Sequence, residues 1–214
     1  MATVTQETIY PTSDGRPMAE TDWHRDIMYA LIKVLQSFYA TDPRVYVSGN
    51  LLLYYVPGNK RRHVSPDVFI VKGVPKRQRP YYLLWEEGKS PNLVIEVTSS
   101  STRSEDTKKK FLLYQDVLKV QEYFLFDPFE EYLRPSFQGY RLRKGKYVPI
   151  PTIGGRLPSS VLGLQLERDG LDLRLFDPRA DKRLPTPEEK IAQTEAELER
   201  LQRELETLRR QMKE

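Results

Sequence analysis

At the centre of this sequence stands the segment Leu93-Val94-Ile95-Glu96-Val97-Thr98, an apolar run that carries one acid. A second run of the same kind, Val68-Phe69-Ile70-Val71, follows Ser65-Pro66-Asp67. Short β-branched runs are typical of buried strands. A carboxylate beside such a strand is unfavourable unless it is paired or binds a cation. Asp67 and Glu96 on neighbouring strands therefore predict a cation site, with Glu96 on the same face as Val94 because side chains alternate.

A helix is expected directly after the second of these runs, and it carries a lysine. Asp106, Lys110 and Tyr114 recur every four residues, so they share one stripe of such a helix. This stripe could turn Lys110 toward the sheet and the two acids. The alternative is an ordinary Asp–Lys pair on the helix surface, which the run Lys108-Lys109-Lys110 also fits.

The surrounding elements follow one order along the chain. A helix is expected from about residue 19 to 40, then a hairpin of residues 45–56 and 62–71, a third strand at 93–98, the lysine-bearing helix, and a strand at 122–126. This is an αβββαβ unit, whose right-handed crossover should make its last two strands parallel in a mixed α/β (α+β) sheet. The apolar face of the first helix consists of Trp23, Ile27, Leu31, Val34, Leu35 and Phe38.

Beyond this unit the pattern changes twice. Residues 139–150 and 162–175 alternate like β-hairpins around Lys144-Gly145 and Asp169-Gly170, and should extend or cover the sheet. A helical tail then begins near Thr186-Pro187-Glu188-Glu189. The sequence thus predicts one domain over residues 1–183 and a coiled-coil tail over 184–214.

The tail has the heptad repeat of a coiled coil. Its apolar positions are Ile191, Leu198, Leu205 and Met212, with Thr194, Leu201 and Leu208 between them. So narrow a seam has nothing to bury it on an isolated helix, which predicts a homodimer. About three heptads make a marginal coiled coil, so the association should be weak or assisted by the domain. The alternative is a tail that folds back on its own domain.

Composition excludes several classes of protein. The 214 residues include no cysteine, so there is neither a disulfide framework nor a thiolate zinc site. With only His24 and His63 to offer imidazole, a bound metal would have mainly oxygen ligands, which favours Mg²⁺ or Mn²⁺. No apolar run has the length of a membrane span, and no signal peptide is visible, so we expect a soluble, cytoplasmic protein without a membrane partner.

Basic residues suggest a nucleic-acid partner. The net charge of +4 is compatible with a polyanion but too small to require one. In the long connection of residues 72–91, basic and aromatic side chains alternate, a combination that suits phosphates and stacked bases. A solvated loop whose aromatics cover the core explains the same residues. The side chains expected to contact nucleic acid are Lys60, Arg61, Arg62, Lys76, Arg77, Arg79 and Lys109.

Taken in order, these motifs resemble the Uma2 family of putative restriction endonucleases, a branch of the PD-(D/E)XK nuclease superfamily. The resemblance covers roughly residues 20–128 and extends through the hairpins to residue 178. It implies a restriction-endonuclease-like core and metal-dependent cleavage of DNA phosphodiesters. The motifs that carry it are Pro66-Asp67, Leu93 to Ser99, the spacing of Asp106, Lys110 and Tyr114, and Glu122-Tyr123 through Asp127-Pro128.

The resemblance also assigns roles to residues. Asp67 and Glu96 match the two acids of the motif and, with the Val97 carbonyl, would hold one or two Mg²⁺ or Mn²⁺ ions. The usual lysine position two residues after Glu96 is Thr98 here, and Lys110 occupies the position to which the lysine has migrated in this family. Lys110 would orient the attacking water or stabilise the transition state.

Two further residues fit the site less directly. Glu20 and His24 lie one turn apart at the start of the first helix, and either matches an upstream helical residue that supports the metal in such nucleases. The alternative makes Glu20 a favourable first-turn acid and His24 a surface residue. For the whole chain, the alternative to an enzyme is an inactive nucleic-acid-binding or scaffolding protein on a degenerate nuclease fold, assembled by its tail.

Overall fold

The computed structural model describes residues 10–13 and 21–212 and is built around a six-stranded mixed sheet. Strands β6 and β7 run parallel, and all other neighbours in this sheet are antiparallel. The predicted mixed α/β fold with a parallel crossover is thereby confirmed. In spatial order the strands are β1 (Val45–Ser48), β4 (Val68–Lys72), β6 (Leu93–Val97), β7 (Glu122–Phe126), β8 (Phe137–Arg143) and β9 (Lys146–Pro149).

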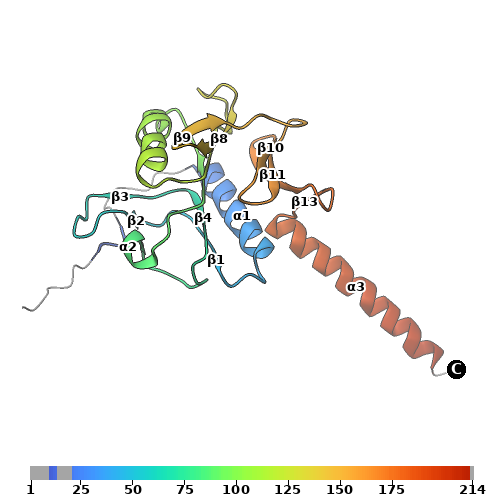
Figure 1. Cartoon of the computed structure of the whole chain (residues 1–214). Helices are drawn as coiled ribbons and strands as arrows, with labels where there is room; N and C mark the ends of the chain where they lie inside the picture. Colours follow the sequence, from blue (N-terminus) through green and yellow to red (C-terminus); the bar gives the residue numbers. More distant parts are fainter. Residues whose placement is uncertain (1–9, 14–20, 213–214) are drawn as a thin grey trace, which may run out of the picture.

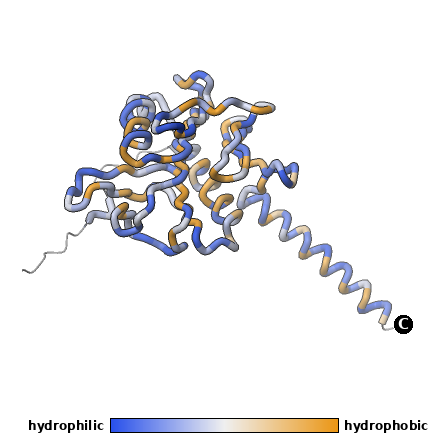
Figure 2. The backbone as a smooth tube through the Cα atoms, in the orientation of Figure 1, coloured by the Kyte–Doolittle hydropathy of each residue, from blue (hydrophilic) through white to orange (hydrophobic). Residues whose placement is uncertain are grey.

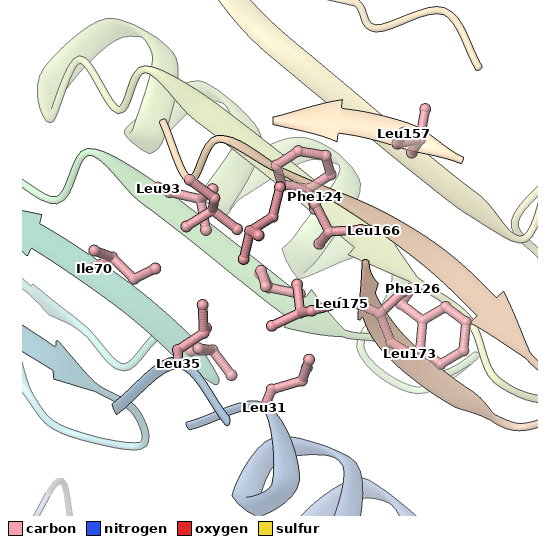
Figure 3. Close-up of a cluster of buried hydrophobic side chains, with 14 of the residues drawn as sticks. Leu31, Leu35, Ile70, Leu93, Phe124, Phe126, Leu157, Leu166, Leu173 and Leu175 are labelled. Atoms are coloured by element: carbon pink, nitrogen blue, oxygen red, sulfur yellow. The ribbon is translucent and has the colours of Figure 1, made fainter. Parts of the chain in front are cut away.

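Helix α1 (Asp22–Phe38) lies between the central sheet and a second, smaller sheet (Figure 1). Its buried residues Leu31 and Leu35 share one apolar cluster with Leu93 of the central sheet and with Leu173 and Leu175 of the smaller sheet (Figure 3). The second hairpin therefore packs on both α1 and the central sheet, since Leu166 lies in the same cluster as Phe124 (Figure 3). The smaller sheet consists of β10 (Leu157–Ser159), β11 (Leu164–Asp169), β12 (Asp172–Asp177) and β13 (Lys182–Arg183).

One member of the predicted apolar face of α1 is placed differently. Trp23 is 53% exposed and packs edge-on against the ring of Phe129, with the centroids 5.8 Å apart. The prediction that Trp23 belongs to the core was wrong, because the buried stripe of α1 begins one turn later, at Ile27. Periodicity alone does not tell where along a helix its packing partner begins.

The opposite face of the central sheet is covered by the crossover helix of residues 103–117. It contains two wide-turned, π-helical stretches, η1 (Glu105–Lys110) and η2 (Leu113–Val117). At its end, the Leu118 amide donates to the Leu113 carbonyl five residues back, at 2.9 Å. π-Helical turns are rare and often occur at functional sites. Tyr114 and Leu118 bury this helix against Val94 and Tyr123 of the sheet.

The predicted first hairpin is interrupted. Its outer parts pair as β1 and β4, but its inner parts, β2 (Leu53–Tyr54) and β3 (His63–Val64), belong to a separate three-stranded sheet. The third strand of that sheet, β5 (Tyr82–Leu83), and the short helix α2 (Leu84–Glu87) come from the long connection of residues 72–91. The aromatic residues Tyr81, Tyr82 and Trp85 pack into buried clusters there.

The C-terminal helix α3 (Pro187–Gln211) projects away from the rest of the chain (Figure 1). Its predicted start is confirmed, since Thr186 and Glu189 form a capping box. Figure 2 shows the helix as mostly hydrophilic, with hydrophobic residues recurring along it. Among the residues described, no helix has the length and apolar character needed to cross a membrane.

Glu122, the first residue of β7, fastens the smaller sheet to the central one. Its buried carboxylate accepts hydrogen bonds from the Arg141 side chain at 2.8 Å and from the Ser160 amide at 2.9 Å. The Ser159 hydroxyl and the Val161 amide donate to its other oxygen. One side chain thus satisfies several polar groups of the segment that connects β10 to β11.

We expect Glu122→Ala to lower the free energy of unfolding by about 3–5 kcal/mol, because it leaves buried donors and a guanidinium without their acceptor. Urea denaturation measures the change. The control is Glu86→Ala, which removes an exposed glutamate of α2 and should cost less than about 0.5 kcal/mol. Equal effects of the two substitutions would contradict the structural role given to Glu122.

Candidate active site

The two acids predicted from the sequence meet across neighbouring strands. Asp67 directly precedes β4, and Glu96 is the fourth residue of β6. The Asp67 amide donates to Glu96 Oε2 at 3.3 Å, and the Val97 amide donates to Asp67 Oδ2 at 2.8 Å. Both carboxylates therefore lie at the same end of the sheet, where the parallel strands β6 and β7 also end.

A close approach of the chain holds Asp67 in place. Gly49 packs so tightly over Asp67 that an added Cβ would lie 1.9 Å from the Asp67 carbonyl oxygen. The next amide, that of Asn50, donates to the Pro66 carbonyl at 2.8 Å. Only glycine fits at position 49 without moving the backbone that presents Asp67.

The crossover helix turns Lys110 toward these acids. Lys110 Nζ lies 3.0 Å from Glu96 Oε2 and 3.1 Å from Asp106 Oδ1. The Asp106–Lys110 pair considered for the helix surface does form, but it is buried: the Asp106 side chain is 2% exposed and that of Lys110 14%. The lysine is thus shared between an acid of its own helix and an acid of the sheet.

Two hydroxyl groups complete the surroundings of the acids. The Tyr114 hydroxyl donates to Glu96 Oε1 at 2.7 Å, and the Thr98 hydroxyl donates to Asp106 Oδ2 at 2.7 Å. Thr98 thus occupies the expected lysine position and holds the helix acid instead. Asp106 was not among the predicted site residues, although its place on the stripe of Lys110 and Tyr114 was the signal that could have identified it.

The charges in this cluster do not balance. Three carboxyl groups, those of Asp67, Glu96 and Asp106, surround the single ammonium group of Lys110. Burial, together with the charges of Asp67 and Asp106, raises the pKa of Glu96 well above its usual value despite Lys110. Burial alone would lower the pKa of Lys110, but the carboxylates outweigh it and raise that pKa. The raised pKa of Lys110 favours its charged form, and the raised pKa of Glu96 reflects carboxyl groups that this one ammonium group does not offset.

His24 stands on the other side of Asp67. Its Nε2 lies 3.2 Å from Asp67 Oδ2, and both side chains are largely buried, at 18% and 14% exposed. Burial would raise the pKa of Asp67, but the hydrogen bond with His24 and the charge of Lys110 outweigh it, so the pKa is lowered. The surface role considered for His24 is excluded by this contact. Glu20, the other predicted residue of this helix, lies outside the described residues.

The donors at this site suit a hard divalent cation. They are carboxyl oxygens, and hard cations such as Mg²⁺ prefer oxygen ligands. In an antiparallel pair the amide and carbonyl of one residue point to the same edge, so the Val97 carbonyl faces the Asp67 side of β6, as its amide does. Over residues 10–13 and 21–212, no three acidic or histidine side chains are arranged as a ready-made metal site.

The predicted nucleic-acid contacts fall into two groups. Arg61, Arg62 and Lys109 line a groove of about 680 Å³ that reaches Lys110, between the β2–β3 turn and the crossover helix. Lys60, on the same turn, is exposed.

The basic residues of the connection have internal partners instead. Arg79, whose side chain is 3% exposed, forms two hydrogen bonds to Glu87, and Arg77 pairs with the same acid. Lys76 donates to the carbonyls of Tyr39 and Ala40. Arg79 was wrongly predicted to bind nucleic acid, because its guanidinium holds the connection together from within.

An acid pair at the end of a mixed sheet, with a lysine from the crossover helix, is the arrangement expected for nucleases of the predicted class. The chain belongs to the Uma2 family, whose sequence model is described as "Putative restriction endonuclease" and matches residues 4–174. This family places the chain among the nucleases, in agreement with the resemblance found in the sequence.

No curated protein matches the chain. Among solved structures, the chain is similar to a putative nuclease belonging to DUF820 from Anabaena variabilis ATCC 29413, with 18% sequence identity and a TM-score of 0.49. The match covers 69% of this chain and 76% of that one.

A double-mutant cycle tests the buried lysine. We expect Lys110→Met, measured in chelator, to reduce the free energy of unfolding by about 3–5 kcal/mol, because it leaves clustered carboxylates without their cation. Adding Glu96→Gln should recover part of this loss, with a coupling of about 0.5–3 kcal/mol. Urea denaturation gives both values. The matched control is Lys146→Met, which removes an exposed lysine paired with Asp116 at 3.3 Å and should change little. Strictly additive effects at positions 96 and 110 would contradict the coupling.

Proposed function

We propose that this chain is a divalent-metal-dependent endonuclease that hydrolyses DNA phosphodiester bonds at Asp67, Glu96 and Lys110. The observation that carries the proposal is the convergence of these residues on Glu96, whose Oε2 accepts from the Asp67 amide at 3.3 Å and lies 3.0 Å from Lys110 Nζ. Membership of the Uma2 family supports the same class of reaction.

Asp67 and Glu96, with the Val97 carbonyl, are the residues that would hold Mg²⁺ or Mn²⁺. When bound, such an ion neutralises charge on a phosphate and makes water more acidic. Its charge would also offset the excess of carboxylates around Lys110. His24 and Tyr114 position the two acids, since each contacts one of the carboxylates from outside the pair.

Lys110 acts as a cation in this proposal. The surrounding carboxylates raise the pKa of Lys110, which favours its protonated form and makes it a poor general base. Its three N–H donors suit a non-bridging phosphate oxygen or the attacking water. In both cases the lysine stabilises negative charge that develops in the transition state.

The groove beside the site supplies a path for the DNA backbone. Its lining includes Lys110 and carries Arg61, Arg62 and Lys109, with Glu105 and Asp116 among its other residues. Cationic side chains in such a groove contact phosphates and position the duplex without reading its sequence. The scissile phosphate would then lie where this groove reaches Lys110.

Cleavage assays on supercoiled, linear and single-stranded DNA with Mg²⁺ or Mn²⁺ test the function. We expect Asp67→Asn, Glu96→Gln and Lys110→Met each to lower the cleavage rate by about 10³-fold or more while the protein stays folded. The controls Asp172→Asn and Lys182→Met make the same changes on the smaller sheet and should retain activity.

The outcomes separate the parts of the proposal. Activity that survives in the Lys110 variant would contradict the role given to this lysine. Absence of cleavage on every substrate, together with DNA binding that is unchanged in chelator, would favour the inactive nucleic-acid-binding protein.

A thermal-shift measurement without DNA tests the metal separately. Because a ligand that binds only the folded state stabilises it, Mg²⁺ or Mn²⁺ at about a hundred times its Kd should raise Tm by roughly 5–10 °C. Glu96→Gln should abolish the shift and Asp172→Asn should keep it, with ionic strength matched by NaCl. An equal shift in all three proteins would show that the ion binds elsewhere.

A further inference from the structure

Helix α3 carries a row of apolar side chains that no described residue covers. Ile191, Leu198, Leu201, Leu205 and Leu208 are between 48% and 59% exposed. They occupy the first and fourth positions of successive heptads, which form the contact seam of a coiled coil. Monomeric proteins rarely leave so regular an apolar row in water, so the row marks an interface.

The other residues that the structure describes leave this seam open. We call the described residues 21–186 the body. The side-chain contacts that join the start of α3 to the body are made by Glu189 with Arg174 and by Lys190 with Ser37. In the heptad that places Ile191 at the first position, Glu189 and Lys190 are the sixth and seventh residues of the preceding repeat. The sixth position faces away from the seam and the seventh flanks it. These contacts therefore leave the first and fourth positions of α3 uncovered.

We propose that the seam binds the same helix of a second copy of this chain, as a parallel, in-register, two-stranded coiled coil. Two helices are the smallest assembly that buries this seam, including Leu201 and Leu208 at its fourth positions. The choice between parallel and antiparallel then depends on the charged residues that flank the seam.

These flanking charges favour the parallel arrangement. In a parallel coil the seventh residue of one heptad faces the fifth residue of the next heptad on the other helix. Glu204 then faces Arg209 of the second copy. An antiparallel coil that aligns the whole seam would instead place Glu197 opposite Glu204 at two symmetric positions. Like charges in such contacts are unfavourable.

The orientation decides where the two bodies lie. Helix α3 begins beside the body and points away from it (Figure 1). A parallel coil therefore joins both bodies at one end, whereas an antiparallel coil would separate them by about 37 Å, the length of 25 helical residues at about 1.5 Å each. Two candidate active sites at one end could serve the two strands of one duplex. That consequence rests on the proposed function, but the assembly does not.

Single cysteines in the full chain test the orientation directly, because the natural sequence has none. We expect both Thr194→Cys and Leu208→Cys to form disulfide-linked homodimers under mild oxidation. The two variants are then mixed, with a size tag on one of them. The product that links position 194 of one copy to position 208 of the other should not exceed background. Those positions lie 14 residues, or about 21 Å, apart along a parallel coil. Arg210→Cys, at an outward-facing position, sets the background.

Each result decides the proposal. A mixed product that exceeds both homodimers would establish the antiparallel coil, and cross-linking no greater than in the Arg210→Cys control would exclude self-association through this seam. Sedimentation of cysteine-free variants is the second measurement. Glu204→Arg should weaken dimerisation by about tenfold, and combining it with Arg209→Glu should restore it. The matched change Glu206→Arg, outside the seam, should leave the dimer unchanged. None of these readouts depends on nuclease activity.

Discussion

At one end of the central sheet, buried carboxyl groups outnumber the single lysine that pairs with them. Asp67, Glu96 and Asp106 converge on Lys110, and burial makes every uncompensated carboxylate unfavourable. A purely structural core does not need such a cluster, because apolar side chains of similar volume often stabilise a fold at least as well. The proposed function accounts for the imbalance, because a bound divalent cation would supply positive charge to these carboxyl groups.

Much of the architecture serves to hold that cluster. The antiparallel pairing of β4 with β6 brings Asp67 to Glu96, and the parallel pairing of β6 with β7 requires the crossover helix that supplies Lys110. The wide turns of that helix keep residues four apart on one face, so Asp106 and Tyr114 accompany the lysine. On the other side of the sheet, α1 delivers His24 to Asp67 while the smaller sheet presses α1 into place.

The sequence predicted the centre of this arrangement better than its periphery. Alternation placed Glu96 on the side of Val94, and a spacing of four placed Lys110 with Tyr114, because both patterns follow from backbone geometry alone. Arg79 and Trp23 could not be predicted in this way. A buried guanidinium paired with Glu87 has the same sequence signature as a free one, and Trp23 meets a ring from a distant loop. Position 49 likewise requires glycine because the Asp67 backbone lies against it, a contact that only the fold reveals.

The most direct test of the charge imbalance is a crystal structure with Mn²⁺, located by its anomalous scattering. The account predicts one or more manganese peaks in contact with both Asp67 and Glu96, with Lys110 still within reach of the site. It also predicts that crystals of the Glu96→Gln variant lose the peak at matched Mn²⁺ concentration. Manganese absent from this position, with Lys110 and Glu96 still paired as in the metal-free chain, would contradict the claim that the cluster is built to receive a divalent cation.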